Sequence, residues 1–448
     1  MQRASARFLR SLPSALPSAL PSPSCRRAAA LQPRQPPLLL APSCCRQSLS
    51  LVPAAAASSP ASPLLAILRR RHQQRLMSSY GAASTAAPSA DAVPVAFDTR
   101  SDTVTKPTPG MLQAMLNAAV GDDVYDEDPS IHKLEAFVAQ LTGKEAALFC
   151  ATGTMTNQLA IRSQIGALES LICDIRAHIF RYECGGVAYH SQAHIIPLQP
   201  PNGGNITLEM IEAQVLTFNV HHAVTKLIEI ENTLGGAVFP YDEIVRISTY
   251  AKQHGIKMHL DGARIWNASI ATGIPLKQYC DHFDSVSLCL SKGLGAPIGS
   301  VLVGSRELIH RARHFRKLFG GGWRQAGLLA AGGQYAIEHQ WTRMADDHAN
   351  AKQFAELITK AGHMTVTNKV ETNMVFVLLN PELRKKGVSW NKIAARLRSV
   401  HGIVVNEDGA HPAPVRFVFH LHITSEATAK LAAAINDEIA QALSAVVA

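Results

Sequence analysis

Short apolar runs alternate with segments of helical apolar spacing along most of the chain after residue 97. Runs that are apolar at nearly every position are typical of strands buried on both faces of a sheet. The runs of this kind lie at 146–153, 170–175, 224–231, 256–262 and 285–291. Their alternation with helical segments predicts an α/β fold, in which helices cover a mainly parallel sheet.

The segment 128–143 has the signals of a helix at both ends. Asp128 can cap its start, Pro129 suits its first turn, and Gly143 suits the position beyond its end. Its apolar residues repeat at helical spacing and make one face. These residues are Ile131, Leu134, Phe137, Val138 and Leu141. A helix is therefore predicted directly before the first buried strand.

A second pattern begins after a long helical region at 305–362. Strand-like runs at 371–379 and 414–421, with a helix between them and another at the end of the chain, are typical of a compact α+β unit. We therefore predict a large α/β domain over residues 93–345 and a smaller C-terminal α+β domain over residues 346–448.

The first 92 residues differ from the rest in composition, and we interpret residues 1–92 as a presequence. Residues 1–90 contain 11 arginines but no lysine, aspartate or glutamate, and they are rich in serine, alanine and proline. This composition resembles a mitochondrial transit peptide and predicts a mitochondrial protein. The alternatives are a disordered extension, or a true start near Met77 that would give a cytoplasmic protein.

The formal net charge of +9 arises from this N-terminal stretch. The other 358 residues carry 32 basic and 34 acidic side chains, so the body of the protein is close to neutral. A near-neutral body argues against nucleic acid or a membrane surface as a partner. The eight cysteines form no CxxC pair, so we expect neither a metal site nor a disulfide framework.

Residues that can carry chemistry follow the predicted strands. Ligands of open α/β sheets bind beyond the carboxyl ends of the strands, so these residues are expected to share one site. They are Gly153 and Thr154 after the first strand, His178 after the second, Asp261 and Arg264 after the fourth, and Ser291 and Lys292 after the fifth.

Lys292 and Asp261 together suit pyridoxal phosphate. Lys292 lies between an apolar run and a glycine-rich stretch, and a partly desolvated lysine is available as an amine for Schiff-base chemistry. Asp261 can pair with a protonated pyridine nitrogen. Each residue also has a simpler interpretation, which is a solvated lysine at a strand end and a turn-forming Asp-Gly. The pair alone is therefore weakly specific.

Three further features fit the same cofactor. Gly153 lies between hydroxyls at the start of a helix, where free backbone N–H groups favour a phosphate, although an ordinary strand–helix turn has the same pattern. His178 could stack on a planar ring or be a structural histidine. Arg416 lies in an apolar run, where either a substrate carboxylate or a structural ion pair would explain it.

Several motifs together resemble one enzyme family. They are "RSDTVT" (100–105), "GDDVY" (121–125), "LSKGLG" (290–295) and "GGGWRQ" (320–325). In unbroken order over about residues 95–448, the chain resembles the low-specificity L-threonine aldolases, which are pyridoxal phosphate enzymes of fold type I. The resemblance implies pyridoxal 5′-phosphate as cofactor and a small-molecule amino acid as substrate.

The resemblance also implies residue roles. Lys292 would form the internal aldimine, Asp261 would pair with the ring nitrogen, and His178 would stack on the ring, which makes these three the catalytic residues. Further cofactor contacts are implied for Gly153, Thr154, Arg264 and Ser291, and substrate contacts for Ser101, Arg264 and Arg416. Such enzymes are usually homotetramers. Residues expected near the site, some of them reaching a neighbouring subunit, are Tyr125, Lys317 and Arg324.

The implied activity is that of an aldehyde-lyase in threonine catabolism and glycine biosynthesis. It cleaves L-threonine and L-allo-threonine to glycine and acetaldehyde, through an external aldimine and a quinonoid intermediate. The alternative is another fold-type-I lyase, either β-eliminating or acting on other β-hydroxy amino acids. One position departs from many bacterial relatives, because Leu234 stands where they have a histidine near the substrate hydroxyl. The general base is therefore left open among His178, His190 and a bound water.

Overall fold

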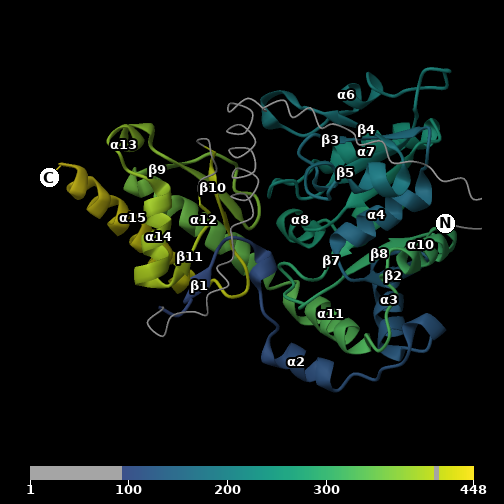
Figure 1. Ribbon diagram of the computed structural model, residues 1–448, viewed down its shortest axis with the longest axis horizontal. Coiled ribbons are helices and arrows are strands. Elements are labelled where there is room, and N and C mark those ends of the chain that lie inside the picture. Colours follow the sequence, from purple (N-terminus) through teal and green to yellow (C-terminus); the bar gives the residue numbers. More distant parts are fainter. Residues whose placement is uncertain (1–92, 408–412, 448) are drawn as a thin grey trace, which may run out of the picture. The chain divides into compact units, whose positions relative to one another are not determined.

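The computed structural model describes residues 93–407 and 413–447, and it is built around a seven-stranded sheet of order β2-β8-β7-β6-β5-β3-β4 (Figure 1). Strands β4, β3, β5, β6 and β7 run parallel, and β8 runs antiparallel to both of its neighbours. The strands span Ala146–Cys150 (β2), Glu169–Asp174 (β3), His194–Leu198 (β4), Val224–Glu231 (β5), Lys257–Asp261 (β6), Ser285–Cys289 (β7) and Ser300–Gly304 (β8). The predicted α/β fold with a mainly parallel sheet is confirmed.

Each of the predicted buried runs contains one strand, but β4 and β8 are not among the predicted runs. Strand β8 follows a glycine-rich stretch that hides it in the sequence pattern. Gly299 precedes it with φ 113°, a conformation that favours glycine, and a Cβ there would lie 2.5 Å from the Phe149 ring. The glycine therefore lets β8 enter the sheet between β2 and β7.

Helices cover both faces of this sheet. One face carries α4 (Gly153–Gln164) and α10 (Arg306–Leu318). Helices α3 (Pro129–Thr142) and α7 (Tyr241–Gln253) pack on the other, with α11 (Gly327–Gln340) against α3. The remaining helical segments before residue 341 are Asp102–Val104 (η1), Pro109–Leu116 (α2), Asp123–Tyr125 (η2), His178–Arg181 (α5), Val187–Ser191 (η3), Pro201–Gly203 (η4), Leu208–Glu212 (α6), Ile265–Thr272 (α8) and Leu276–Cys280 (α9).

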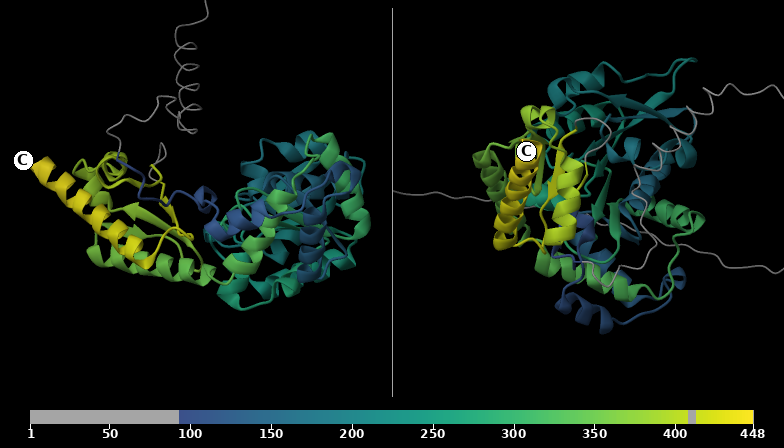
Figure 2. Two further views of the ribbon diagram at one scale, coloured as in Figure 1. Left: turned by 90° about the horizontal axis from the view of Figure 1, so that it is seen from below. Right: turned by 60° about the vertical axis from the view of Figure 1, so that its left-hand side comes forward.

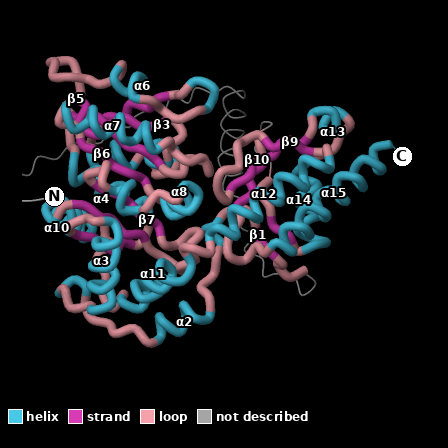
Figure 3. Tube along the Cα trace, turned by 180° about the vertical axis from the view of Figure 1, so that it is seen from behind, coloured by secondary structure: helices cyan, strands magenta, loops and turns pink. Residues whose placement is uncertain are grey.

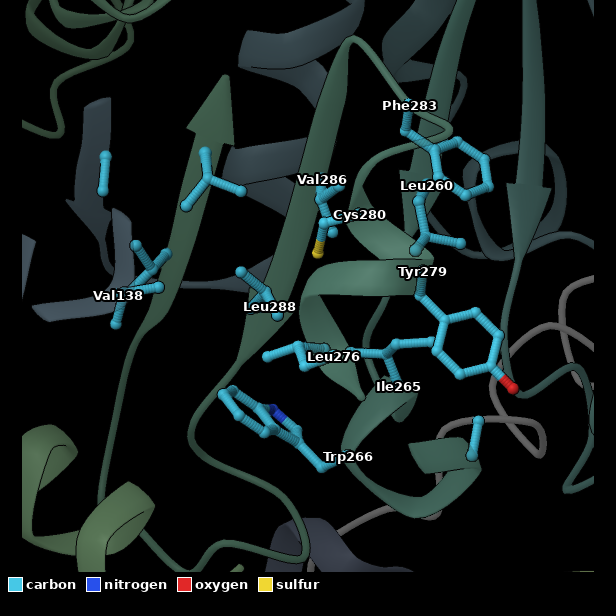
Figure 4. Close-up of a cluster of buried hydrophobic side chains, with 14 of the residues drawn as sticks. Val138, Leu260, Ile265, Trp266, Leu276, Tyr279, Cys280, Phe283, Val286 and Leu288 are labelled. Carbon is cyan, nitrogen blue, oxygen red and sulfur yellow. The ribbon is translucent and has the colours of Figure 1, made fainter. Parts of the chain in front are cut away.

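The largest hydrophobic core lies on the face covered by α3, α8 and α9 (Figure 4). Trp266 and Tyr279 are the largest side chains in this cluster, and they are essentially inaccessible to solvent. They pack with side chains of β6 and β7, of which Figure 4 labels Leu260, Val286 and Leu288. Burying an apolar side chain of this size contributes about 1.5–3 kcal/mol each, so this layer holds the sheet in place.

The C-terminal part forms its own hydrophobic cluster around Phe354, Trp390 and Phe417. A three-stranded antiparallel sheet of order β12-β10-β9 lies within it, and the long helix α15, yellow in Figure 2, packs on α12 and α14. The elements are Met344–Ala361 (α12), Met364–Val366 (β9), Met374–Leu379 (β10), Pro381–Lys385 (α13), Trp390–His401 (α14), Ile403–Val404 (β11), Val415–Val418 (β12) and Ser425–Val447 (α15).

A short strand near residue 97 pairs with the C-terminal part of the chain. Strand β1 (Phe97–Asp98), labelled in Figure 3, pairs in parallel with β11, and the Phe97 side chain packs on the C-terminal cluster. The predicted boundary between residues 345 and 346 stays a prediction, and the presequence predicted over 1–92 lies outside the described residues. Within the described ranges, every helix is too short or too polar to span a bilayer.

Candidate active site

A cavity of about 180 Å³ opens beyond the carboxyl ends of β6 and β7. It brings together six of the residues that the sequence analysis singled out. They are Gly153, Thr154, His178, Asp261, Ser291 and Lys292. Larger hollows of about 540 and 550 Å³ lie beside Arg176 and beside Lys252, and none of the predicted residues lines them. The cavity that Lys292 lines is therefore the candidate active site.

Lys292 is held in this cavity through its main chain. It lies three residues beyond β7, and its carbonyl oxygen accepts hydrogen bonds from the Thr105 hydroxyl at 3.1 Å and from the Gly295 N–H at 2.8 Å. Its side chain is half-buried and lies in the same cavity as His178 and Asp261. A fixed backbone with a free amine end is what a Schiff-base lysine needs.

Helix α4 begins at the opposite wall of the cavity. The Thr152 hydroxyl caps it by accepting from the Met155 N–H. A Cβ on Gly153 would lie only 2.6 Å from the Cys289 sulfur, so only glycine lets the helix start this close to β7. The first N–H groups of a helix have no partners within it, and its dipole favours an anion there. The turn can therefore hold a phosphate.

Asp261 ends β6 and is buried. One carboxylate oxygen accepts from the Asn157 amide at 2.7 Å, and the other accepts from the Ala263 N–H at 3.0 Å. The two donors fix the position of the carboxyl group, which can pair with a protonated ring nitrogen.

His178 begins α5 and is tied down by two carboxylates. Its backbone N–H donates to Glu231 at 2.8 Å, and its ring Nδ1 lies 2.8 Å from a Glu183 oxygen. The bond to Glu183 raises the pKa of His178, against the opposing effect of burial. The ring is half-buried and lines the cavity.

Arg264 forms an ion pair with a buried carboxylate. Two nitrogens of its guanidinium donate to the two oxygens of buried Asp102 at 2.8 and 2.6 Å. Burial would raise the pKa of Asp102, but the Arg264 charge lowers it to about 2. The Ser101 hydroxyl adjoins this pair and lies 3.4 Å from an Asp102 oxygen. Arg264 thus has a carboxylate partner within its own chain, and its contacts with cofactor and substrate stay predictions.

Arg416 lies on β12, and its guanidinium has no carboxylate partner among the described residues. Its Nη2 donates to the Arg100 carbonyl at 3.0 Å. Burial and the charge of Arg264 lower the pKa of Arg416. A half-buried guanidinium without a carboxylate partner is suited to bind an anion, which favours the predicted carboxylate clamp over a structural ion pair.

Tyr125, Lys317 and Arg324 do not line the Lys292 cavity of their own chain. Tyr125 is 73% exposed, and Arg324 donates to Asp122 at 2.9 Å. Lys317 lines a separate hollow of about 210 Å³ on α10. That these residues reach a neighbouring subunit's site stays a prediction.

The positions of Leu234 and His190 bear on the identity of the general base. Leu234 is 9% exposed, and its N–H donates to the Ala237 carbonyl at 3.1 Å, so an apolar side chain occupies that position. The His190 ring packs 4.2 Å from the Phe319 ring and does not line the cavity. Of the two histidines proposed as base, only His178 lies in the cavity of this chain.

The sequence analysis gave no role to four polar residues of this site, namely Asp102, Asn157, Glu183 and Glu231. Glu231 ends β5 beside Asp261, and burial followed by the Asp261 charge raises its pKa to about 7. Asp102 lies in the quoted "RSDTVT" motif, and Asn157 ends the stretch that begins at Gly153. Glu183 carries no sequence signal, because only the fold brings it under His178.

Among the described residues, one group has the spacing of a metal site. Ligand atoms of His178, Glu183 and Asp261 lie within 4.8 Å of one another. The Asn157 amide, however, donates hydrogen bonds to both carboxylates, so N–H groups already occupy the space between them. This arrangement is a hydrogen-bonded cluster, and its donors would repel a cation.

Comparison with known proteins shows the family of this chain. The β-eliminating lyase family model matches residues 98–381. The low-specificity L-threonine aldolase of Escherichia coli K12 is 39% identical over 337 residues, which cover 75% of this chain and 97% of that protein. The probable low-specificity L-threonine aldolase of Schizosaccharomyces pombe is 47% identical over 299 residues, with 65% and 79% covered.

Solved structures agree in fold. A threonine aldolase of Leishmania major has a TM-score of 0.65 at 19% identity, covering 77% of this chain and 99% of that one. Serine palmitoyltransferase of Sphingomonas wittichii has a TM-score of 0.63 at 15% identity, covering 86% and 99%. The fold is thus that of the fold-type-I pyridoxal phosphate enzymes, whose cofactor the donor set around Lys292 fits. Within this class, the chain belongs to the low-specificity L-threonine aldolase family.

Proposed function

We propose that this protein cleaves L-threonine and L-allo-threonine to glycine and acetaldehyde, with pyridoxal 5′-phosphate as its cofactor. The observation that carries the proposal is one cavity lined by a lysine amine, a buried carboxylate and the start of a helix. The names of its relatives supply the substrate, because the same set of groups serves many reactions of amino acids.

Different residues of the cavity would hold different parts of the cofactor. Lys292 would bind its aldehyde, the N–H groups of Gly153 and Thr154 with the Ser291 hydroxyl would hold its phosphate, and Asp261 would keep its ring nitrogen protonated. When bound, the cofactor supplies an electron sink for the bond that breaks. The His178 ring would cover one face of the cofactor ring and exclude water from it.

Arg416 would bind the substrate carboxylate and so fix the orientation of the scissile Cα–Cβ bond. Its lack of a carboxylate partner within the described ranges supports this role, as does the ion pair that Arg264 already forms with Asp102. Ser101 would add a hydroxyl donor beside it. A cation that is already desolvated binds a carboxylate strongly in this environment.

The reaction also needs a group that takes the proton of the β-hydroxyl. His178 is the histidine of the cavity, and its Nδ1 is engaged with Glu183, which leaves Nε2 for the substrate. A raised pKa makes this ring a stronger base that carries its proton for more of the pH range. A positioned base contributes about 10²–10⁴-fold to a rate, so a water held by these groups would still allow turnover.

A product assay tests the proposal against a β-eliminating lyase. The protein is incubated with L-threonine, L-allo-threonine and L-serine, and acetaldehyde, glycine, ammonia and 2-oxo acids are measured. Retro-aldol cleavage gives equal amounts of acetaldehyde and glycine from both threonine diastereomers. Ammonia with a 2-oxo acid, and no acetaldehyde, would instead assign the rival reaction.

We also propose that the protein is imported into mitochondria and works as a homotetramer. Support for import is the arginine-rich composition of residues 1–90, which is tested by locating a reporter fused to residues 1–92 beside one without them. Support for association is a hollow of about 460 Å³ lined by apolar side chains of α2 and α11, with Leu116 81% exposed. Light scattering of the purified protein reads the subunit number.

A further inference from the structure

A single buried amide joins two carboxylates beneath the cavity. The Asn157 Nδ2 group donates to Asp261 at 2.7 Å and to Glu183 at 2.9 Å, and all three side chains are almost fully buried. Both N–H bonds of one amide are therefore used by two acidic groups on different elements. The amide holds these like charges in fixed positions and compensates them at once.

The orientation of this amide is set by a chain of hydrogen bonds from the sheet. The Asn157 Oδ1 atom lies 3.1 Å from His259 Nε2, and His259 Nδ1 lies 2.9 Å from the Ser285 hydroxyl, which accepts from Gln164 at 2.8 Å. Burial lowers the pKa of His259 to about 4, so its ring is neutral and has one donor and one acceptor nitrogen.

One pattern gives Ser285, His259 and Asn157 a partner for each of these contacts. Gln164 donates to Ser285, Ser285 donates to His259, and His259 donates from Nε2 to the Asn157 carbonyl oxygen. The amide nitrogen must then face the carboxylates of Asp261 and Glu183. A flipped amide would direct its oxygen at two acidic groups and its nitrogen at a ring donor, which would leave buried groups unpaired.

Glu183 transmits this orientation to His178. Its buried carboxylate accepts from Asn157, from Gln158 at 2.6 Å and from His178 Nδ1 at 2.8 Å. Two amide N–H groups already donate to this carboxylate, and an imidazole that also donates to it must carry its proton on Nδ1. The imidazole of His178 therefore has a fixed plane and a fixed tautomer.

We propose that Asn157, Glu183 and His259 are positioning residues of the active site, which orient Asp261 and His178 through the Asn157 amide. Asp261 and His178 would contact opposite parts of the cofactor, so one amide aligns both. The proposal rests on the proposed function only for its cofactor and not for its substrate.

Two variants probe the two arms of this network. Asn157→Asp keeps the shape but replaces the donor between two carboxylates with an acceptor. Losing a buried hydrogen bond to a charged group costs about 1.5–3 kcal/mol, so the cofactor dissociation constant should rise about 10- to 100-fold. Glu183→Gln removes the charge beside His178, and the ring should titrate at lower pH than in the wild-type protein.

The measurements use the full chain without any substrate. Cofactor affinity is measured by titrating the apoprotein with pyridoxal phosphate, and the histidine titrations are followed by NMR, with His178→Asn to assign the signal. The titratable groups that face His178 are Glu183, Asp261, Lys292, Glu231 and Tyr182. Because threonine is absent, a failed aldolase assay would leave these readouts intact.

Three further variants keep the test decisive. Gln158→Met removes a donor from Glu183 but none from Asp261, so it should move the His178 titration and change cofactor affinity less than about threefold. Ser170→Ala removes a buried hydrogen bond at the other end of β3 and controls for lost stability. If Asn157→Asp does not fold, His259→Met replaces it, with about a tenfold loss of affinity expected.

Two results would overturn the proposal. One is cofactor affinity in Asn157→Asp, or in its replacement His259→Met, that equals the affinity of Ser170→Ala. The other is a His178 titration that stays unchanged in Glu183→Gln.

Discussion

The two faces of the central sheet are built from the same strands but from different chemistry. On the face under α3, α8 and α9, the side chains of β5, β6 and β7 are apolar, with Ile228, Leu260 and Leu288 among them. On the face under α4, the same strands carry Glu229, His259 and Ser287 at the alternate positions. In these central strands, alternation thus places apolar side chains on one face and polar side chains on the other, and these are called the apolar face and the polar face below.

The difference shows how this fold supports a charged site. The apolar layer supplies the burial that keeps the strands rigid, so the polar face can hold groups that would be costly in a less rigid interior. Most of those groups are paired with α4, as Thr156 is with Ser287 at 2.5 Å and Asn157 with Asp261. The carboxyl ends of the strands extend this polar face into the cavity.

Replacing Lys292 should have the largest effect on turnover and almost none on the stability of the sheet. Lys292→Ala should remove nearly all turnover, at least about 10³-fold, together with the visible absorbance of the bound cofactor. Its half-buried side chain adds little to the core, so the melting temperature of the apoprotein should stay close to that of the wild type. Normal turnover in this variant would refute the assignment of Lys292.

Removing a large side chain from the apolar face should lower stability and leave cofactor affinity unchanged. Trp266→Ala removes a fully buried indole that packs 5.1 Å from the Trp341 ring, and it should lower the free energy of unfolding by about 3–5 kcal/mol. Denaturant titration measures this loss. The fraction that remains folded should keep its cofactor affinity, and a selective loss of affinity without a loss of stability would contradict the division between the faces.

The pattern of apolar positions was enough to predict five strands of the sheet, because a strand buried on both faces is a short run that is apolar at nearly every position. It located Lys292, Asp261 and His178, each of which follows a predicted strand. The polar face was not predicted. Glu229 and His259 lie within apolar runs, and nothing in their neighbours shows which side of the sheet they face or that α4 supplies their partners.

Other features depend on contacts between distant segments, which a local pattern does not report. Asp102 meets Arg264 across 162 positions of sequence, and Phe97 meets the C-terminal cluster. Strand β8 was missed because glycines precede it, although all of its residues are buried. The resemblance to a family gave Arg416 a role in advance, and the structure adds that no described carboxylate neutralises it.

A smaller effect is expected from the one carboxyl group of the polar face that lacks a donor. Both oxygens of Glu229 are buried without a hydrogen-bond partner in the described structure, and burial, followed by the charge of Asp261, raises its pKa well above the usual value. The group is therefore neutral when folded and ionised when unfolded, so its contribution to stability falls as pH rises above about 4.5.

Glu229→Gln removes this titration. Relative to the wild type, the variant should gain about 1–3 kcal/mol of unfolding free energy between pH 5 and pH 8, with little difference at pH 4. Denaturant titrations at several pH values measure the difference. Glu212→Gln, on the exposed side of α6, is the matched control and should give no pH-dependent gain. A gain that is the same at every pH would show that the titration of Glu229 is not its cause.

The smallest effect is expected at position 234, where an apolar residue borders the polar end of the sheet. Leu234→His introduces an imidazole whose possible bond to the substrate hydroxyl is worth about 0.5–1.5 kcal/mol net, so the ratio of kcat/KM for the two threonine diastereomers should change by about 2- to 10-fold. Leu234→Met keeps the site apolar and should leave the ratio unchanged. Both variants and the wild type are compared on L-threonine and L-allo-threonine side by side. A ratio that Leu234→His leaves unaltered would mean that this position does not contact the substrate hydroxyl, and that discrimination at Cβ lies with His178 and its carboxylates.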